Sequence, residues 1–301
     1  MDAGFSLSIL VLMIMNIDPQ TVLDTLLSRC KEHYSPCGQG NLIWREWGEK
    51  KVEKRPLILL HGGSGAWNHW TRTIPALEND FQIYLVDLPG CGDSADPPKP
   101  YDAESLVEII SLGLDTILPN GEPFDLISFS FGGVLSGLLA HSQARRIRSL
   151  TLVGSPILGL TGTGPANDLV EVPQGIPLRE AVPLYKHNLQ NLMLFKPEAI
   201  DDLALTIHIN NMSKARLRSR GIARTSVLAD SLNELPCALT CIFGAEDTTL
   251  NPNLEGVREY VHSLHPNTEF HVIPESGHWV QFESSEKVND ILLKNFNRVQ
   301  S

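Results

Sequence analysis

The sequence predicts an α/β fold, in which helices flank a mostly parallel central sheet. Short apolar runs alternate with helical patterns along most of the 301 residues, as expected when a parallel sheet is built strand by strand. Several of these runs are continuously apolar, as strands buried on both faces are. Hydrophobic residues make up 42% of the chain, which is enough for a sizeable core.

The chain divides into a core and an insertion. Residues 31–157 and 234–301 are predicted to form the core, preceded by an N-terminal extension and helix over residues 1–30. Residues 158–233 contain no convincing strand pattern. The beginning of this gap is rich in glycine and proline, and the remainder places apolar residues three and four apart, as helices do. We therefore expect it to form a helical cap over the sheet.

Seven strands and four helices are predicted within the core. The strands are expected at Leu42–Trp47, Pro56–Leu60, Gln82–Val86, Phe124–Ile127, Ser149–Val153, Leu239–Phe243 and Glu269–Ile273. The helices between them are expected at Asp102–Ile117, Gly132–Ala140, Asn253–Ser263 and Ser285–Phe296.

The N-terminal segment allows two interpretations. Residues 5–17 are nearly all apolar, but a bilayer span needs about 20 such residues, and the basic flank of a signal peptide is missing. One interpretation is that translation starts at Met15 rather than Met1, or that the segment is a poorly ordered extension. The other is an apolar tail that packs on the domain or on a membrane surface. A helix is predicted to follow, with Asp18 as N-cap and Pro19 as its first residue.

Charge and cysteine content narrow the class of protein. The formal net charge of −11 argues against a nucleic-acid partner, because binding phosphates requires an excess of lysine and arginine. The five cysteines are odd in number and lack the spacing of a zinc site, so we expect reduced thiols, a cytoplasmic protein and no metal. These cysteines are Cys30, Cys37, Cys91, Cys237 and Cys241.

The central chemical signal is a serine between a predicted strand and a predicted helix. The strand leads directly into Ser-Phe-Ser-Phe-Gly at residues 128–132, with Ser130 in the middle. A nucleophilic serine needs this strand–turn–helix context, because the sharp turn exposes its hydroxyl and brings the residues two before and two after into contact. Gly132 and Ser128 are both small enough. We therefore predict Ser130 as a nucleophile.

A glycine-rich turn follows an earlier buried strand. The sequence His-Gly-Gly-Ser-Gly at residues 61–65 allows a backbone N–H to approach a substrate oxygen closely. The N–H groups of Gly63 and Phe131 are predicted to form an oxyanion hole, which stabilises the charge that develops in the transition state. His61 is expected to shape the turn itself.

Two further strand ends supply an acid and a base. Asp247 follows the strand Leu239–Phe243, with Glu246 beside it as the alternative acid, and His278 lies in the loop after Glu269–Ile273. Histidine has a pKa near neutrality, so it can take the serine proton and return it to the leaving group. A carboxylate behind it fixes the tautomer. The chain order Ser130, Asp247, His278 therefore predicts a catalytic triad that needs no cofactor.

Jointly these motifs resemble the α/β-hydrolase superfamily, from about residue 42 to residue 296. Besides the serine turn, the resemblance rests on His-Gly-Gly at 61–63, Asp-Leu-Pro-Gly-Cys-Gly-Asp-Ser at 87–94 and Gly-His at 277–278. It implies a central sheet with the triad at the strand ends. It also implies that the cap is inserted after the strand Ser149–Val153.

Within that superfamily, residues 277–283 resemble meta-cleavage-product C–C hydrolases and epoxide-hydrolase-like proteins. Epoxide hydrolases use aspartate where this chain has Ser130, and the C–C hydrolases usually carry asparagine where it has Phe129. We therefore predict a serine hydrolase, an esterase that cleaves a small, largely apolar carboxylic ester through an acyl-enzyme. C–C bond hydrolysis of a diketone-like ring-fission product, or ligand binding without catalysis, are the alternatives.

Two further sets of residues are candidates for contacting the substrate. Ser64, Trp67, Phe129 and Trp279 adjoin the motifs and are predicted to line the pocket, although Trp67 and Trp279 are equally expected to anchor their loops in the core. A basic cluster in the cap is expected to be a solvated helix face, since its members at 216, 220 and 224 are four apart. A sharper hypothesis is that one of its members binds a carboxylate or phosphate of the substrate. The cluster comprises Lys214, Arg216, Arg218, Arg220 and Arg224.

Overall fold

The computed structural model describes residues 18–49, 54–160, 168–250 and 254–298. The apolar segment 5–17, and with it the choice between Met1 and Met15, lies outside the described residues. The helix predicted to follow is present as α2 (Pro19–Leu27). The Asp18 side chain accepts a hydrogen bond from the backbone N–H of Thr21, which confirms the predicted N-cap.

One eight-stranded sheet organises the chain. Its order is β1-β2-β4-β3-β5-β6-β7-β8, and all neighbours are parallel except β1 with β2 and β2 with β4. All seven predicted strands are present, with ends within two residues of those expected. The strands are β1 (Lys31–Cys37), β2 (Gly40–Trp47), β3 (Arg55–Leu60), β4 (Phe81–Val86), β5 (Phe124–Phe129), β6 (Ile147–Val153), β7 (Ala238–Gly244) and β8 (Glu269–Ile273).

The eighth strand, β1, was not predicted. It lies at the edge of the sheet and pairs only with β2. Most of its residues are exposed or half-buried, so its sequence, Lys-Glu-His-Tyr-Ser-Pro-Cys, carries no apolar run. Its proline, Pro36, is tolerated because an edge strand need not donate every backbone hydrogen bond. An edge strand of this kind leaves little signal in the sequence.

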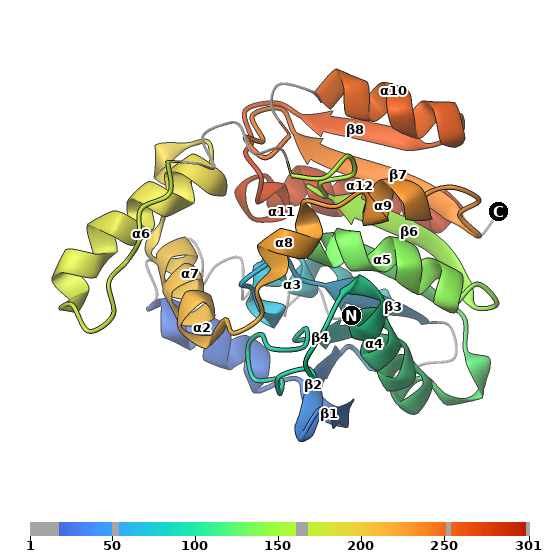
Figure 1. Cartoon of the computed structure of the whole chain (residues 1–301), viewed down its shortest axis with the longest axis horizontal. Helices are drawn as coiled ribbons and strands as arrows, with labels where there is room; N and C mark the ends of the chain where they lie inside the picture. Colours follow the sequence, from blue (N-terminus) through green and yellow to red (C-terminus); the bar gives the residue numbers. More distant parts are fainter. Residues whose placement is uncertain (1–17, 50–53, 161–167, 251–253, 299–301) are drawn as a thin grey trace.

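Helices cover both faces of the sheet, as Figure 1 shows. The side chains of β3 alternate between two separate cores: Ile58 and Leu60 face one, Leu57 and Leu59 the other. The first core is covered by α4 (Ala103–Ile117), α5 (Phe131–Ser142) and α10 (Leu254–Leu264). The second is covered by α2, α3 (Ile74–Leu77), α11 (Val280–Glu283) and α12 (Ser285–Arg298). The four predicted core helices are thus confirmed, apart from Asn253, which lies outside the described residues.

A helical insert joins β6 to β7, as predicted. It contains α6 (Leu178–Leu192), η4 (Pro197–Ala199), α7 (Asp202–Lys214), α8 (Ser219–Ala223) and α9 (Val227–Ser231). The helices α6 and α7 pack on each other at one side of the sheet, with α7 next to α2, whereas α9 packs on α5 (Figure 1). Apolar residues of α6 and α7, among them Leu189 and Ile207, join the second core. The limits 158–233 for the cap stay a prediction.

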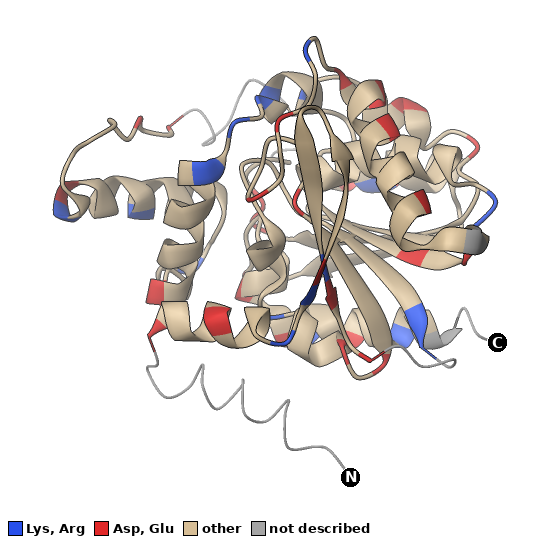
Figure 2. Cartoon of the chain, turned by 90° about the horizontal axis from the view of Figure 1, so that it is seen from below, with Lys and Arg blue, Asp and Glu red and all other residues tan. Residues whose placement is uncertain are grey.

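The basic cluster does not form the single helix face that the spacing predicted. The short α8 begins three residues after Arg216 and ends one residue before Arg224, so these two arginines lie outside it. Lys214 and Arg216 instead form ion pairs with Asp93 and Asp96 in the loop after β4. Figure 2 shows acidic and basic residues spread over many elements of the chain. Within the described ranges, no helix combines the length and apolar character needed to cross a membrane.

Candidate active site

Ser130 occupies a strained turn between β5 and α5. Its φ is +50° and its ψ −115°, a conformation that residues other than glycine rarely adopt and that is concentrated at functional sites. The turn is held by a hydrogen bond of 2.9 Å from the Ser130 N–H to the carbonyl of Val153. A Cβ on Gly132 would lie 2.6 Å from the carbonyl oxygen of His61. The small residue expected at this position is therefore required sterically.

Three predicted residues from three strand ends meet at this turn. The Oγ of Ser130 lies 2.8 Å from Nε2 of His278, and Nδ1 of His278 lies 2.8 Å from Oδ2 of Asp247. The side chains of His278 and Asp247 are almost completely buried. Because a carboxylate only accepts hydrogen bonds, Nδ1 carries the imidazole proton and Nε2 is free to accept from the serine hydroxyl. This is the arrangement needed to remove a proton from Ser130.

Thr249 is a residue of this site that the sequence did not suggest. Its N–H and its hydroxyl both donate to Oδ1 of Asp247, at 2.9 and 2.7 Å. These two bonds satisfy the carboxylate oxygen that does not face His278, and so fix the rotation of the carboxyl group. A threonine two residues after an acid is common in loops, so nothing in the sequence marked it.

The glycine-rich turn after β3 is held by His61. The N–H of Leu88 donates to Nε2 of His61, so the ring proton must be on Nδ1, which donates to the carbonyl oxygen of Gly62. The N–H of Gly65 donates to the same oxygen. Since a peptide unit is planar and trans, fixing this carbonyl also fixes the direction of the Gly63 N–H. Burial lowers the pKa of His61, which favours the neutral ring.

The two predicted oxyanion donors lie on adjacent backbone segments. A Cβ on Gly63 would lie 3.6 Å from Cβ of Phe131, the first residue of α5. Among the described hydrogen bonds there is none donated by either N–H. The Phe131 N–H is one of the unpaired donors at a helix N-terminus, where a developing negative charge is favoured. A Cβ on Gly63 would also lie 2.7 Å from Oγ of Ser219 in the cap, so the cap closes over this turn.

Three of the four predicted pocket residues lie beside His278 or in the glycine-rich turn, and the fourth lies in the second core. Phe129 packs on His278, with a distance of 5.0 Å between the ring centroids, and Trp279 directly follows His278 and is fully buried. Ser64 is half-buried in the glycine-rich turn, with a φ of +50°. Trp67 instead stacks on Trp47, 5.6 Å away in the second core, and serves to anchor its loop.

His69 is a second site residue that the sequence did not indicate. It is almost completely buried, and its ring centroid lies 5.4 Å from Phe129 and 5.1 Å from Trp279. The N–H of Gly62 donates to its Nδ1. Burial, and to a lesser extent the neighbouring histidines, hold the pKa of His69 well below its usual value, so the ring is neutral. His69 lies in η1 (Trp67–Trp70), and no motif in the sequence distinguishes it from the residues around it.

Glu283 connects the histidine loop to the cap. Its carboxylate accepts from the N–H groups of Gly277, Phe195 and Lys196, at 2.7, 3.1 and 2.6 Å. A further bond of 2.7 Å runs from the Trp279 N–H to the carbonyl of Met193. The loop that carries His278 is thus fixed to the end of α6, and its position depends on the cap.

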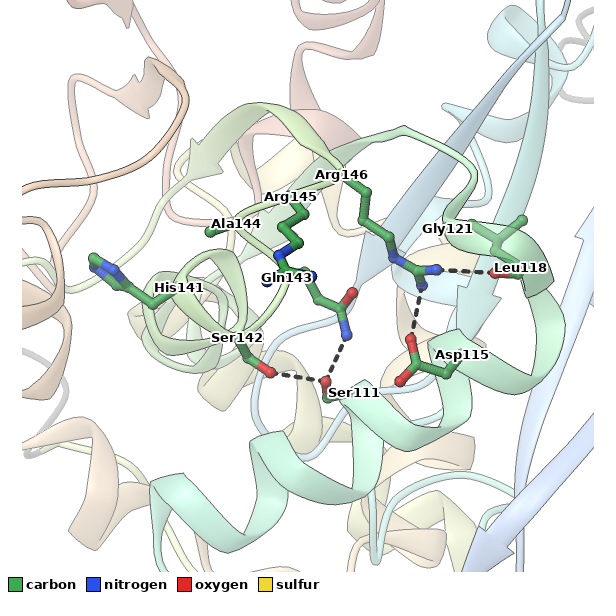
Figure 3. A pocket seen from close by; sticks show the side chains of 10 residues that line it. All are labelled: Ser111, Asp115, Leu118, Gly121, His141, Ser142, Gln143, Ala144, Arg145 and Arg146. Carbon is green, nitrogen blue, oxygen red and sulfur yellow. Dashed lines mark hydrogen bonds and ion pairs between the residues drawn. The ribbon is translucent and has the colours of Figure 1, made fainter.

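A separate open pocket of about 760 Å³ lies at the far ends of α4 and α5 (Figure 3). The 12 residues of α5 separate it from Ser130, which corresponds to about 18 Å along the helix. Its polar side chains mostly bind one another: Arg146 donates to the carbonyl of Leu118 and pairs with Asp115, and Gln143 donates to Ser111. These contacts complete the two helix ends and share no residue with the triad.

Several known proteins are similar to this chain in sequence. A family model described as the alpha/beta hydrolase family matches residues 57–291. The dihydrolipoyllysine-residue acetyltransferase component of the acetoin cleaving system of Pseudomonas putida is 29% identical over 79% of this chain, which spans only 62% of that relative's length. A 2-hydroxy-6-oxononadienedioate/2-hydroxy-6-oxononatrienedioate hydrolase of Paraburkholderia phymatum is 28% identical over 87% of this chain and 89% of its own.

Solved structures share the fold. A meta-cleavage product hydrolase superposes with a TM-score of 0.69 at 21% identity, over 88% of this chain and 98% of that one. A carboxylesterase from Bacillus subtilis superposes with a TM-score of 0.72 at 17% identity, over 91% of this chain and 95% of that one. Hydrolases that are named for different activities therefore have the same architecture, and the fold alone does not determine which reaction this chain performs.

Proposed function

Because the chain belongs to the alpha/beta hydrolase family, we propose that it is a serine hydrolase that cleaves a small, largely apolar carboxylic ester. The observation that carries this proposal is the continuous hydrogen-bonded series from Ser130 through His278 to Asp247. A buried, oriented imidazole next to a strained serine is the arrangement that activates a hydroxyl for attack on a carbonyl.

Acylation begins with attack of Ser130 Oγ on the ester carbonyl carbon. As the Oγ–C bond forms, the hydroxyl proton passes to Nε2 of His278, and the carbonyl electrons move to the oxygen. Asp247 stabilises the imidazolium through its bond to Nδ1. The tetrahedral intermediate then collapses: the bond to the alcohol oxygen breaks, His278 donates its proton to that oxygen, and the alcohol leaves.

The N–H groups of Gly63 and Phe131 act on the oxyanion. Two backbone donors of fixed direction stabilise the charge only when it forms, so they lower the barrier rather than tighten ground-state binding. A single donor of this kind contributes about 10²–10³-fold to kcat. In this proposal His61 acts indirectly, because it fixes the peptide that carries the Gly63 donor.

Deacylation repeats these steps with water as the nucleophile. His278 takes a proton from the water, which attacks the acyl carbon, and the oxyanion again rests on the two N–H groups. Collapse breaks the bond to Ser130 Oγ, His278 returns the proton to it, and the carboxylic acid leaves. The residues named here suffice for the whole cycle.

C–C bond hydrolysis of a diketone-like ring-fission product is the second candidate. It is favoured by the relative from Paraburkholderia phymatum, which matches over most of both chains and is named for hydrolysis of dienedioate compounds. Phe129, in the position before the nucleophile, is the sequence feature that weighs against it. A chromogenic ring-fission substrate, whose absorbance falls on cleavage, distinguishes the two reactions.

The first experiment is covalent labelling with a fluorophosphonate, followed by intact-mass measurement of wild type and Ser130→Ala. The proposal predicts one adduct on wild type and none on the variant. A screen of p-nitrophenyl esters of increasing chain length then defines the acyl pocket. Folded wild-type protein that forms no adduct and hydrolyses no ester would contradict the proposal and favour ligand binding without catalysis.

A further inference from the structure

The cap presents one polar helix face to the candidate site. His208 and Asn211 are three residues apart on α7, so they lie on the same face of that helix. The buried amide of Asn211 donates to Oδ1 of Asn68 at 2.7 Å. Asn68 directly precedes His69 in the η1 turn. This hydrogen bond therefore holds the α7 face that carries His208 against the turn that carries His69.

The two histidines are neutral for structural reasons. Nδ1 of His69 accepts a backbone N–H, so the neutral ring carries its proton on Nε2, for which the described residues offer no acceptor. His208 makes an edge-on ring contact with Tyr185 at 5.7 Å and interacts electrostatically with His69, and it has no hydrogen-bond partner in the described part of the chain. Burial lowers the pKa of His208 to about 4, and no carboxylate acts against this.

The arginine nearest to this turn already has its own partners. Arg72 lies three residues after His69, but it pairs with Asp201 at 2.7 Å and donates to the carbonyl of Phe282. Its guanidinium also stacks on the Phe282 ring. The region between α7 and η1 thus offers uncharged N–H donors and aromatic surface. A carboxylate buried there would lose its hydration without gaining an opposite charge.

We propose that the part of the substrate that reaches the cap is uncharged, and that His208 and His69 orient it through its hydrogen-bond acceptors and exclude a carboxylate. This rests on the proposed function, and it narrows the substrate class to neutral esters whose acyl chain carries an ether, ketone or second ester oxygen. His69 and His208 are specificity residues here; neither transfers a proton.

A matched pair of substrates tests the proposal. Both are p-nitrophenyl adipates; one ends in a free carboxylate and the other in a methyl ester. Release of p-nitrophenolate gives kcat/KM for each. Wild type is expected to favour the methyl ester by about 100-fold, because the acid must bury an unpaired charge. Equal values, or preference for the acid, would overturn the proposal.

His208→Arg supplies the missing positive charge. It is expected to reduce the preference for the methyl ester by about tenfold or more, mainly by lowering KM for the acid. His208→Gln keeps a neutral donor and is expected to keep the preference. The matched control is Met212→Arg, which adds the same charge to the exposed face of α7. If Met212→Arg changes the ratio as much as His208→Arg does, long-range attraction is the cause and the proposal is wrong.

Binding without turnover separates this proposal from the proposed function. Ser130→Ala cannot form an acyl-enzyme, so the thermal shift produced by an ester reports binding alone. Dimethyl adipate is expected to raise the melting temperature and monomethyl adipate is not. A larger or equal shift with the monoacid, or no shift with either, overturns the specificity proposal. The labelling experiment on Ser130 decides the catalytic proposal independently.

Discussion

The core and the cap contribute to the candidate site in different ways. The core holds Ser130, Asp247 and His278 at the ends of the parallel strands β5, β7 and β8, where hydrogen bonds join the three side chains. The cap contacts the same region through a few polar bonds between side chains and backbone, such as Asn211 to Asn68. Rigid strand ends suit the chemistry, which needs sub-ångström placement.

This difference separates what the two regions are expected to control. A change in the core should alter kcat for every substrate, because it acts on bonds that all substrates share. A change in the cap should alter which substrates bind, or how firmly the cap is held. Insertions between strands can vary without disturbing the sheet, which is how one fold supports many hydrolytic reactions. Substitutions in the core, in the cap and at the contacts between them test this difference.

The largest effect is expected from Asp247→Asn. The amide keeps the size of the side chain but no longer fixes the His278 proton on Nδ1, so kcat should fall by about 10⁴-fold while the melting temperature changes little. Glu246→Gln is the matched control, because Glu246 is exposed and adjacent. The measurement is kcat for ester hydrolysis by both variants, compared with wild type. Comparable losses in the two variants would mean that Asp247 has no special role.

Glu283→Gln is expected to weaken the connection between core and cap. One amide oxygen cannot replace a carboxylate that accepts from three backbone N–H groups, so the unfolding free energy should fall by about 2–3 kcal/mol. Because the loop of His278 is held by these bonds, kcat should fall as well. Glu286→Gln, at an exposed position on α12, serves as control. Denaturant titration that gives equal stabilities for both variants would contradict this account.

An effect on pH stability is expected from His208. Its pKa is about 4 in the folded chain and near 6.5 when unfolded. Between these values the unfolded chain binds more protons, so the unfolding free energy falls as the pH drops from about 6.5 to about 4. His208→Gln should remove about 2 kcal/mol of this loss, less than the full shift because the ring is partly exposed.

The measurement is denaturant unfolding at pH 7.5 and pH 4.5. His61 and His69 are also buried, with pKa values lowered in the same direction, so the variant should keep part of the pH dependence. His187→Gln, at an exposed position of α6, is the matched control. A pH dependence unchanged by His208→Gln would mean that the ring is hydrated in the folded protein.

The difference between core and cap also explains which features could be predicted from the sequence. Buried parallel strands are continuous apolar runs, so seven of the eight strands were predicted from local patterns. The resemblance to the superfamily rested on short local motifs and agrees with the family that the chain matches. The three candidate triad residues were identified because motifs at strand ends mark them. His69 and Glu283 escaped prediction because their partners lie up to 210 and 88 residues away, which no local pattern encodes. Thr249 lies only two residues from Asp247, but no motif marks it.

The basic cluster in the cap also shows that local sequence patterns do not encode long-range contacts. A spacing of four residues predicted one helix face, but a helix forms only where its backbone can continue, and α8 is five residues long. The ion pairs of Lys214 and Arg216 with Asp93 and Asp96 span about 120 residues of sequence. Local periodicity carries no information about such contacts, so the cluster's attachment to the core was visible only in the structure.

The smallest effect is expected from Arg216→Ala. Arg216 donates to Asp96 and to the backbone oxygens of Ser94 and Lys214, and its own N–H donates to Gly90. Half of its side chain is exposed, so truncation should lower the unfolding free energy by only about 1 kcal/mol.

Arg220→Ala is the matched control for this change, because Arg220 is exposed and has no partner in the described part of the chain. Arg216 anchors the segment that carries Ser219 over Gly63, so its loss should raise KM two- to threefold, roughly, with kcat nearly unchanged. A fall in kcat with KM unchanged would mean that the cap positions the catalytic groups themselves. The separation of a rigid core from an adjustable cap would then fail at this contact.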